Sequence, residues 1–110
     1  MLCFASRKFV AVLLLCVSAA VWADAVTDRA QLLLQRKDAA AAYKLLLPYE
    51  SERAGNPEFD YLLGIAALDA GDPERAIFAL ERVLAVQPDN LQARAEIARA
   101  SKASTPAARR

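Results

Sequence analysis

The sequence predicts an all-α fold built from repeated pairs of short helices and preceded by an export signal. Three observations lead to this prediction: an internal repeat, helix start signals at regular places, and apolar residues at helical spacing. The repeat appears when the chain is aligned with itself at the offset that places residue 30 on residue 64. The positions that match are Ala30 with Gly64 and Ala98, Asp38 with Asp72, Ala42 with Ala76, and Leu46 with Leu80. A unit of this length suits two helices that bury their apolar faces by stacking on neighbouring units.

The segment at positions 1–23 is interpreted as a secretory signal peptide. Arg7 and Lys8 precede an apolar run at positions 9–17, and Val21 and Ala23 then offer small side chains to a signal peptidase. This order is typical of a cleaved export signal, and the apolar stretch is shorter than the roughly 20 residues of a membrane-spanning helix. We therefore expect cleavage after Ala23 and an exported chain, in the periplasm or at the periplasmic face of the outer membrane. The membrane is then a partner only through this segment, if it remains uncleaved.

The composition of the mature chain excludes several classes of chemistry. Cys3, Cys16 and Trp22 all lie in the signal segment, and the whole sequence contains no histidine. The mature chain thus has no thiol nucleophile, no histidine base and no nitrogen or sulfur ligands for zinc. Loss of Arg7 and Lys8, with no acidic residue before Asp24, changes the net charge from +1 to −1. This near-neutral charge argues against a nucleic-acid partner.

Acidic pairs are the remaining candidates for catalysis, and their spacing does not favour it. Glu50 and Glu52 are separated by a single residue, so they do not face each other on a helix. Asp69 with Asp72 is the other pair, and Asp72 is better explained as a helix cap. We predict no enzyme, no cofactor and no metal site. Adjacent opposite charges are interpreted as solvated surface, namely Glu74 with Arg75 and Glu81 with Arg82.

The first unit, residues 23–56, is expected to hold two helices separated by a turn at Lys37-Asp38. Pro48 lies within the second of these helices. Because proline has no backbone N–H and disfavours a helical residue before it, we expect a kink or an early end near Leu47.

The second unit has the clearest helix punctuation. Asn56 is a good cap and Pro57 suits a first turn, so a helix should begin there. Gly71 supplies the left-handed residue that ends this helix, and Asp72 repeats the start signal. The second helix is expected over residues 73–86. The apolar positions of the two helices are Phe59, Leu62, Leu63, Ala66, Ala67 and Ala70, then Ala76, Ile77, Leu80, Val83 and Leu84.

The third unit is expected to hold one helix. Asn90 caps it and Leu91 begins it, and the charges spread around residues 91–103 favour a capping role. The helical domain is therefore placed at residues 24–103, with a disordered tail at 104–110. The alternative is that the chain is the front of a longer protein.

The second unit resembles a tetratricopeptide repeat over residues 57–90. The residues that carry the resemblance are Leu63, Gly64, Gly71, Asp72, Ala76, Leu80, Leu84 and Pro88. It implies a short helix-turn-helix solenoid of about two and a half repeats, in which small residues at Gly64 and Ala76 let paired helices approach closely. The chain departs from the pattern at Asp60 and Ala67, where a large aromatic residue is usual. Phe59 and Tyr61 are expected to supply some of that bulk.

In such a solenoid the first helix of each unit lines a groove that binds partners. The residues that this places in the groove are Thr27, Gln31, Tyr61, Ile65, Leu68, Asp69, Arg99 and Lys102. Their mixture of apolar, aromatic and basic side chains suits an extended or helical peptide with an apolar anchor. The alternative for Ile65 and Leu68 is a core position between repeats.

The stretch from Tyr49 to Pro88 looks like the N-terminal repeats of exported bacterial tetratricopeptide proteins. We therefore predict a non-catalytic protein–protein interaction module of the bacterial envelope, which binds a protein or peptide through its groove. The alternative is a structural role, as the N-terminal fragment of a longer outer-membrane protein of this type or in self-association through the ends of the stack.

Overall fold

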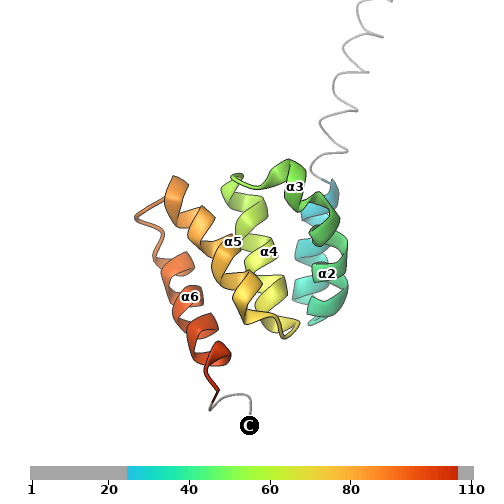
Figure 1. Ribbon diagram of the computed structural model, residues 1–110. Helices are drawn as coiled ribbons and strands as arrows, with labels where there is room; N and C mark the ends of the chain where they lie inside the picture. Colours follow the sequence, from blue (N-terminus) through green and yellow to red (C-terminus); the bar gives the residue numbers. More distant parts are fainter. Residues whose placement is uncertain (1–24, 107–110) are drawn as a thin grey trace, which may run out of the picture.

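The computed structural model describes residues 25–106, all helices and their connections (Figure 1). The predicted signal peptide and residues 107–110 of the predicted tail lie outside this range. The first helix covers residues 25–35, and no strand forms within the described range. The elements that follow are α2 (Ala39–Leu46), the 3-10 turn η1 (Leu47–Tyr49), α3 (Glu50–Arg53), α4 (Pro57–Asp69), α5 (Pro73–Val86) and α6 (Leu91–Ser104). The predicted all-α class is confirmed.

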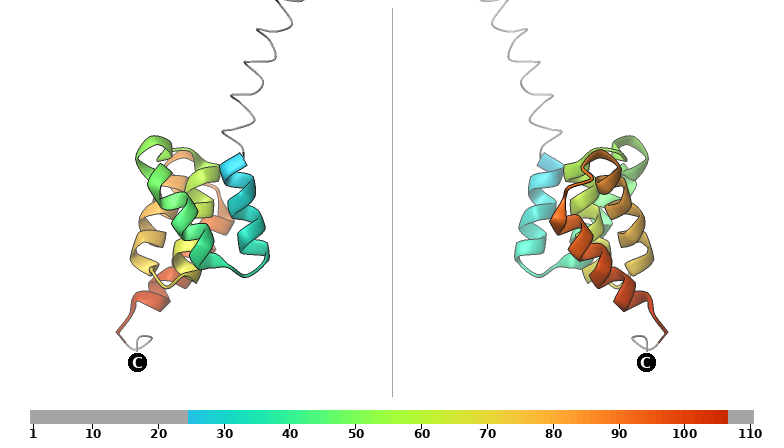
Figure 2. Two further views of the ribbon diagram at one scale, coloured as in Figure 1. Left: turned by 90° about the vertical axis from the view of Figure 1, so that its right-hand side faces the viewer. Right: turned by 90° about the vertical axis from the view of Figure 1, so that its left-hand side faces the viewer.

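The helices pack in the order in which they occur in the chain. The first helix and α2 lie at one end, α4 and α5 in the middle and α6 at the other end (Figures 1 and 2). The most extensive contact joins α4 to α5, α5 also packs on α6, and α4 also packs on α2. In contrast, α6 touches α4 only marginally. Each helix thus depends mainly on its neighbours in sequence.

Side-chain caps fix where the three longest helices begin, and they confirm the predicted starts. Asn56 Oδ1 accepts hydrogen bonds from the backbone N–H groups of Glu58 at 3.1 Å and Phe59 at 3.4 Å. Asp72 Oδ1 accepts one from the N–H of Arg75 at 3.2 Å, and Asn90 Oδ1 accepts one from that of Ala93 at 3.0 Å. The first-turn N–H groups have no partner within their own helix, so each cap stabilises a helix by about 1 kcal/mol.

The turns that end the first helix and α4 lie one repeat offset apart and have the same hydrogen bonds. Gly71 is in the predicted left-handed conformation, with φ of 98°. Lys37 occupies the equivalent position of the earlier turn, with φ of 65°. A lysine has a conformational penalty there that glycine avoids. The bonds are Lys37 N to Leu34 O and Asp38 N to Leu33 O in the first turn, then Gly71 N to Leu68 O and Asp72 N to Ala67 O in the second. The sequence repeat is therefore also a repeat of backbone structure.

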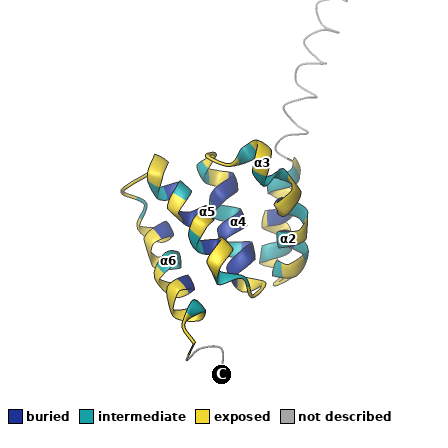
Figure 3. Ribbon diagram, in the orientation of Figure 1, coloured by how far each residue is buried: buried dark blue, intermediate teal, exposed yellow. Residues whose placement is uncertain are grey.

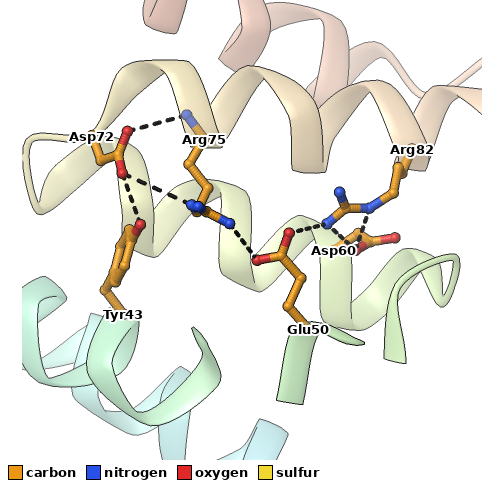
Figure 4. A network of polar contacts seen from close by, with 6 residues as sticks. All are labelled: Tyr43, Glu50, Asp60, Asp72, Arg75 and Arg82. Atoms are coloured by element: carbon orange, nitrogen blue, oxygen red, sulfur yellow. Dashed lines mark hydrogen bonds and ion pairs between the residues drawn. The ribbon is translucent and has the colours of Figure 1, made fainter. Parts of the chain in front are cut away.

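The helix that follows the first turn is interrupted at Pro48, as predicted. α2 ends at Leu46, η1 carries the chain through the proline, and α3 is a single further turn. This interruption positions Glu50, the first residue of α3, beside the arginines of α5 (Figure 4).

The core lies between the packed helices, and α4 contributes more buried residues to it than any other helix of the described range (Figure 3). Its largest fully buried apolar side chains are Phe59, Leu46, Leu63, Leu80 and Val83. Gly64 lies under Leu80 so closely that a Cβ atom there would be 2.7 Å from Leu80 Cγ. The matching residue Ala30 is also buried, whereas Ala98, the third member of the set, is exposed. The small residue at this repeat position is thus buried in the two units in which a second helix follows.

Candidate functional site

One stripe of α4 carries three of the residues predicted to bind a partner. Tyr61, Ile65 and Asp69 are spaced by four, which places them on the same side of the helix. Tyr61 and Ile65 are half-buried, and Asp69 is exposed. Leu68 lies beside this stripe but is only 8% exposed, packed with Ala67, Ala76 and Ala100. Leu68 therefore occupies a core position, which was the alternative expectation for this residue.

Charged residues of α6 meet this stripe. Arg99 Nη1 donates a hydrogen bond to Asp69 Oδ1 at 2.9 Å, and Arg99 Nε donates one to Glu96 Oε2 at 2.8 Å. About half of the Arg99 side chain and 41% of the Asp69 side chain remain exposed. We call this surface, formed by Tyr61, Ile65 and Asp69 with Glu96 and Arg99, the α4–α6 seam. Lys102 is exposed one turn further along α6.

The ionisation of the seam reflects how close its groups lie. Burial is the main cause that raises the pKa of Tyr61, and the negative charge of Glu96 raises it further while Arg99 lowers it. For Arg99, burial acts to lower the pKa, but the hydrogen bonds to Glu96 and Asp69 outweigh it and the pKa is raised. The tyrosine therefore stays neutral and the arginine stays charged at physiological pH.

The other two predicted groove residues lie elsewhere, on the first helix. Thr27 lines a hollow of about 310 Å³ with Arg53 and Phe59, and Gln31 lines one of about 290 Å³ with Leu32. A larger hollow of about 660 Å³ lies along the outer face of α5. None of these three hollows is lined by a seam residue. The structure therefore brings together the predicted residues of α4 and α6, but not those of the first helix.

An ion pair with a buried carboxylate is the feature that sequence reasoning missed. Asp60 is completely buried, and its Oδ1 accepts two hydrogen bonds from Arg82, from Nε at 3.1 Å and Nη2 at 3.0 Å. Asp60 Oδ2 accepts a third from the N–H of Gly55 at 2.8 Å. The signal was present in the sequence, since Asp60 occupies a position where the resembled pattern has a large aromatic residue.

The ion pair belongs to a longer chain of polar contacts (Figure 4). Glu50 accepts hydrogen bonds from Arg82 at 3.4 Å and from Arg75 Nη1 at 2.9 Å. At the far end the hydroxyl of Tyr43 donates to Asp72 Oδ2 at 2.8 Å. The interpretation of Arg82 as solvated surface was therefore wrong, because its side chain joins α5 to α3 and α4. The side chain of Arg75 is 44% exposed, and its ion pair with Glu50 lies at the surface. The ion pairs of Glu50 and Asp60 thus connect α3 and α4 to α5.

Tyr43 gives this network a pH dependence that can be measured. Burial, followed by its hydrogen bond to Asp72, raises the pKa of Tyr43 to about 12, above the ordinary value of about 10. Because the raised pKa favours the neutral phenol in the folded state, the stabilisation is complete below pH 10 and is lost as the pH rises from 10 to 12. We expect a tyrosinate absorbance component at 295 nm with a midpoint near pH 12 that Tyr43→Phe removes and Tyr49→Phe retains. A Tyr43 component that titrates near pH 10 would contradict this assignment.

Two features are absent from the described range. Among residues 25–106 no group of three or more histidine, cysteine, aspartate or glutamate side chains is arranged to hold a metal ion. No helix in the same range has the length and apolar character needed to cross a bilayer.

Comparison with known proteins gives no match, whether to protein-family models, to curated proteins or to solved structures.

Proposed function

We propose that this chain is a non-catalytic protein-binding module of the tetratricopeptide type, exported to the bacterial envelope, whose α4–α6 seam holds a segment of a partner protein. The observation that carries the proposal is the order of side chains on the seam. A half-buried aromatic and aliphatic pair, Tyr61 and Ile65, is followed by the exposed pair of Asp69 with Arg99. An apolar centre bordered by charges is the usual composition of a protein interface.

The repeat supports the choice of module. Turn hydrogen bonds and a buried small residue recur at the repeat offset between the first helix and α4, and the asparagine cap of α4 recurs on α6. Stacked helix pairs of this kind form extended concave surfaces that bind partners, and the first helix of each pair lines that surface. The seam lies on two such first helices, α4 and α6.

The chemistry of the seam suggests the partner segment. Tyr61 offers a large, rigid contact area of the kind that dominates binding energy. Arg99 is already neutralised by two carboxylates, so Lys102 is the cation that is left to attract the partner. We therefore expect a helical or extended segment with an apolar anchor for Tyr61 and Ile65 and an acidic residue for Lys102.

Site-specific photo-crosslinking tests this proposal in cells that produce the full chain. Benzoylphenylalanine replaces Ile65 in one variant and Gln35, an exposed residue of the first helix, in a control variant. We expect a specific protein adduct from position 65 only. The captured protein is then identified, purified and titrated against the full chain.

Charge variants then test the expected contact of the partner with Lys102, next to the seam. We expect Lys102→Glu to weaken binding by about five- to tenfold, a loss of roughly 1–1.4 kcal/mol. The matched control Lys44→Glu makes the same charge change on α2 and should leave the affinity unchanged. Equal adducts from both crosslinking positions, or equal affinities of both lysine variants, would remove the support for the seam. Adducts between two copies of the chain would instead favour the structural alternative, self-association.

A further inference from the structure

The inward face of α6 repeats the inward face of α4. On α4, Phe59, Leu63 and Ala66 are buried in a cluster with residues of α2. The residues one repeat offset later, on α6, are Ala93, Ile97 and Ala100, and they pack in the same way against the middle of the stack. Thus α6 presents to α5 the positions that α4 presents to α2. The contacts made by the other residues of α4 therefore indicate which contacts the equivalent residues of α6 are shaped to make.

A second face of α4 is covered by α5 at three places. Asp60 is paired with Arg82, Gly64 lies beneath Leu80, and Ala67 shares a cluster with Ala76. The residues one repeat offset later are Arg94, Ala98 and Ser101, and all three are exposed. Leu91 extends the same side of the helix and is 74% exposed. We call Leu91, Arg94, Ala98 and Ser101 the open α6 face, because no helix within residues 25–106 covers it.

We propose that the open α6 face receives an acidic amphipathic helix of another protein, placed on α6 as α5 is placed on α4. The contact of Leu80 with Gly64 serves as the template for a leucine of the partner above Ala98. The pairing of Asp60 with Arg82 serves as the template for the charge, but with the signs reversed, because α6 has Arg94 at this place.

Charge determines the nature of this helix. Arg94 is exposed and donates one hydrogen bond to the carbonyl of Pro88 at 2.8 Å, which leaves other donors of its guanidinium for a carboxylate. On α5 the charged residue follows the leucine by two positions, so the partner helix needs an acidic residue two positions after its leucine.

A second copy of this chain is the less suitable occupant. Its α5 has the leucine at position 80 but an arginine at position 82, which would bring two guanidinium groups together. The first helix has an exposed Leu32, but residue 34 is leucine and offers no carboxylate. The proposed occupant is therefore a different protein. The open α6 face is also separate from the crosslinking position used for the seam, so either surface can fail without the other.

The test uses two synthetic peptides and the full chain. One peptide has the sequence of residues 73–87 with Arg82→Glu, and its matched control has the unaltered sequence. Binding is followed by amide chemical shifts of the ¹⁵N-labelled chain. We expect shifts concentrated in residues 91–102 and an affinity about fivefold higher for the glutamate peptide, as one partly exposed ion pair provides about 1 kcal/mol.

Variants of the chain make the result specific to the face. Arg94→Glu should reverse the preference, so that the unaltered peptide binds more tightly, and Ala98→Trp should weaken both peptides by filling the place of the leucine. Arg94 and Ala98 are exposed, so circular dichroism should show both variants folded. Equal binding of the two peptides, an unchanged preference in Arg94→Glu, or shifts centred on Gly64 would overturn the proposal. A concentration-dependent dimer broken by Ala98→Trp would also overturn it, in favour of a second copy.

Discussion

Replacing Arg82 with methionine is expected to lower the free energy of unfolding by about 3–5 kcal/mol. The side chain of Asp60 is completely buried, and Arg82 supplies two of its three hydrogen bonds. Methionine would leave a buried carboxylate with only the N–H of Gly55. Urea unfolding at pH 7, followed by circular dichroism at 222 nm, measures the loss.

Two further variants distinguish the stability lost by leaving a buried carboxylate without its partner from the stability lost by breaking an exposed ion pair. Arg75→Met removes an arginine that is 44% exposed and contacts the same Glu50, so it should cost less than about 1 kcal/mol. Asp60→Leu combined with Arg82→Met removes the buried carboxylate together with its partner and should recover most of the stability lost in the single variant. If the two arginine variants lost the same stability, the burial of Asp60 would not be the cause.

Replacing Gly64 with valine is expected to lower the free energy of unfolding by about 2–3 kcal/mol, although glycine is the poorer helix former. The new Cβ would lie 2.7 Å from Leu80 Cγ and 2.9 Å from Leu80 Cδ2, and Leu80 is fully buried. The helices α4 and α5 would have to separate. The same urea titration gives the magnitude.

The repeat provides a matched control for this substitution. Ala98→Val adds bulk at the equivalent position of α6, where the residue is exposed, and should change stability by less than about 0.5 kcal/mol. Gly64→Val combined with Leu80→Ala should lose less than the sum of its two single variants, since the alanine makes room for the valine. Additive losses would show that the close contact does not limit the packing.

Helix boundaries could be predicted from the sequence because their causes are local. Asn56, Asp72 and Asn90 each bond to N–H groups within the first turn that follows them, so the capping signal and its effect lie in the same stretch of chain. Pro48 likewise acts on its own turn. The repeat offset then indicated the all-α class, because equal spacing of these signals implies equal units.

The polar network and part of the candidate site could not be predicted in this way. Asp60 and Arg82 are far apart in the sequence, and their contact depends on how α4 and α5 rotate against each other. Periodicity gives each helix an apolar side but does not say which charged neighbour reaches across. The same limit explains why Asp69 and Arg99 were both predicted in the site without their ion pair, while Thr27 was grouped with residues that the structure places elsewhere.

The way α6 is held has a consequence for motion. It rests on α5 through small side chains such as Ala93 and Ala100, and it barely touches α4. Opening α6 leaves the packing of α4 against α5 intact. The amide protons of α6 should therefore exchange with solvent through a partial opening whose free energy is below that of global unfolding. Local stability then falls toward this end of the chain, and a helix bound over Ala98 would slow the exchange of α6 first.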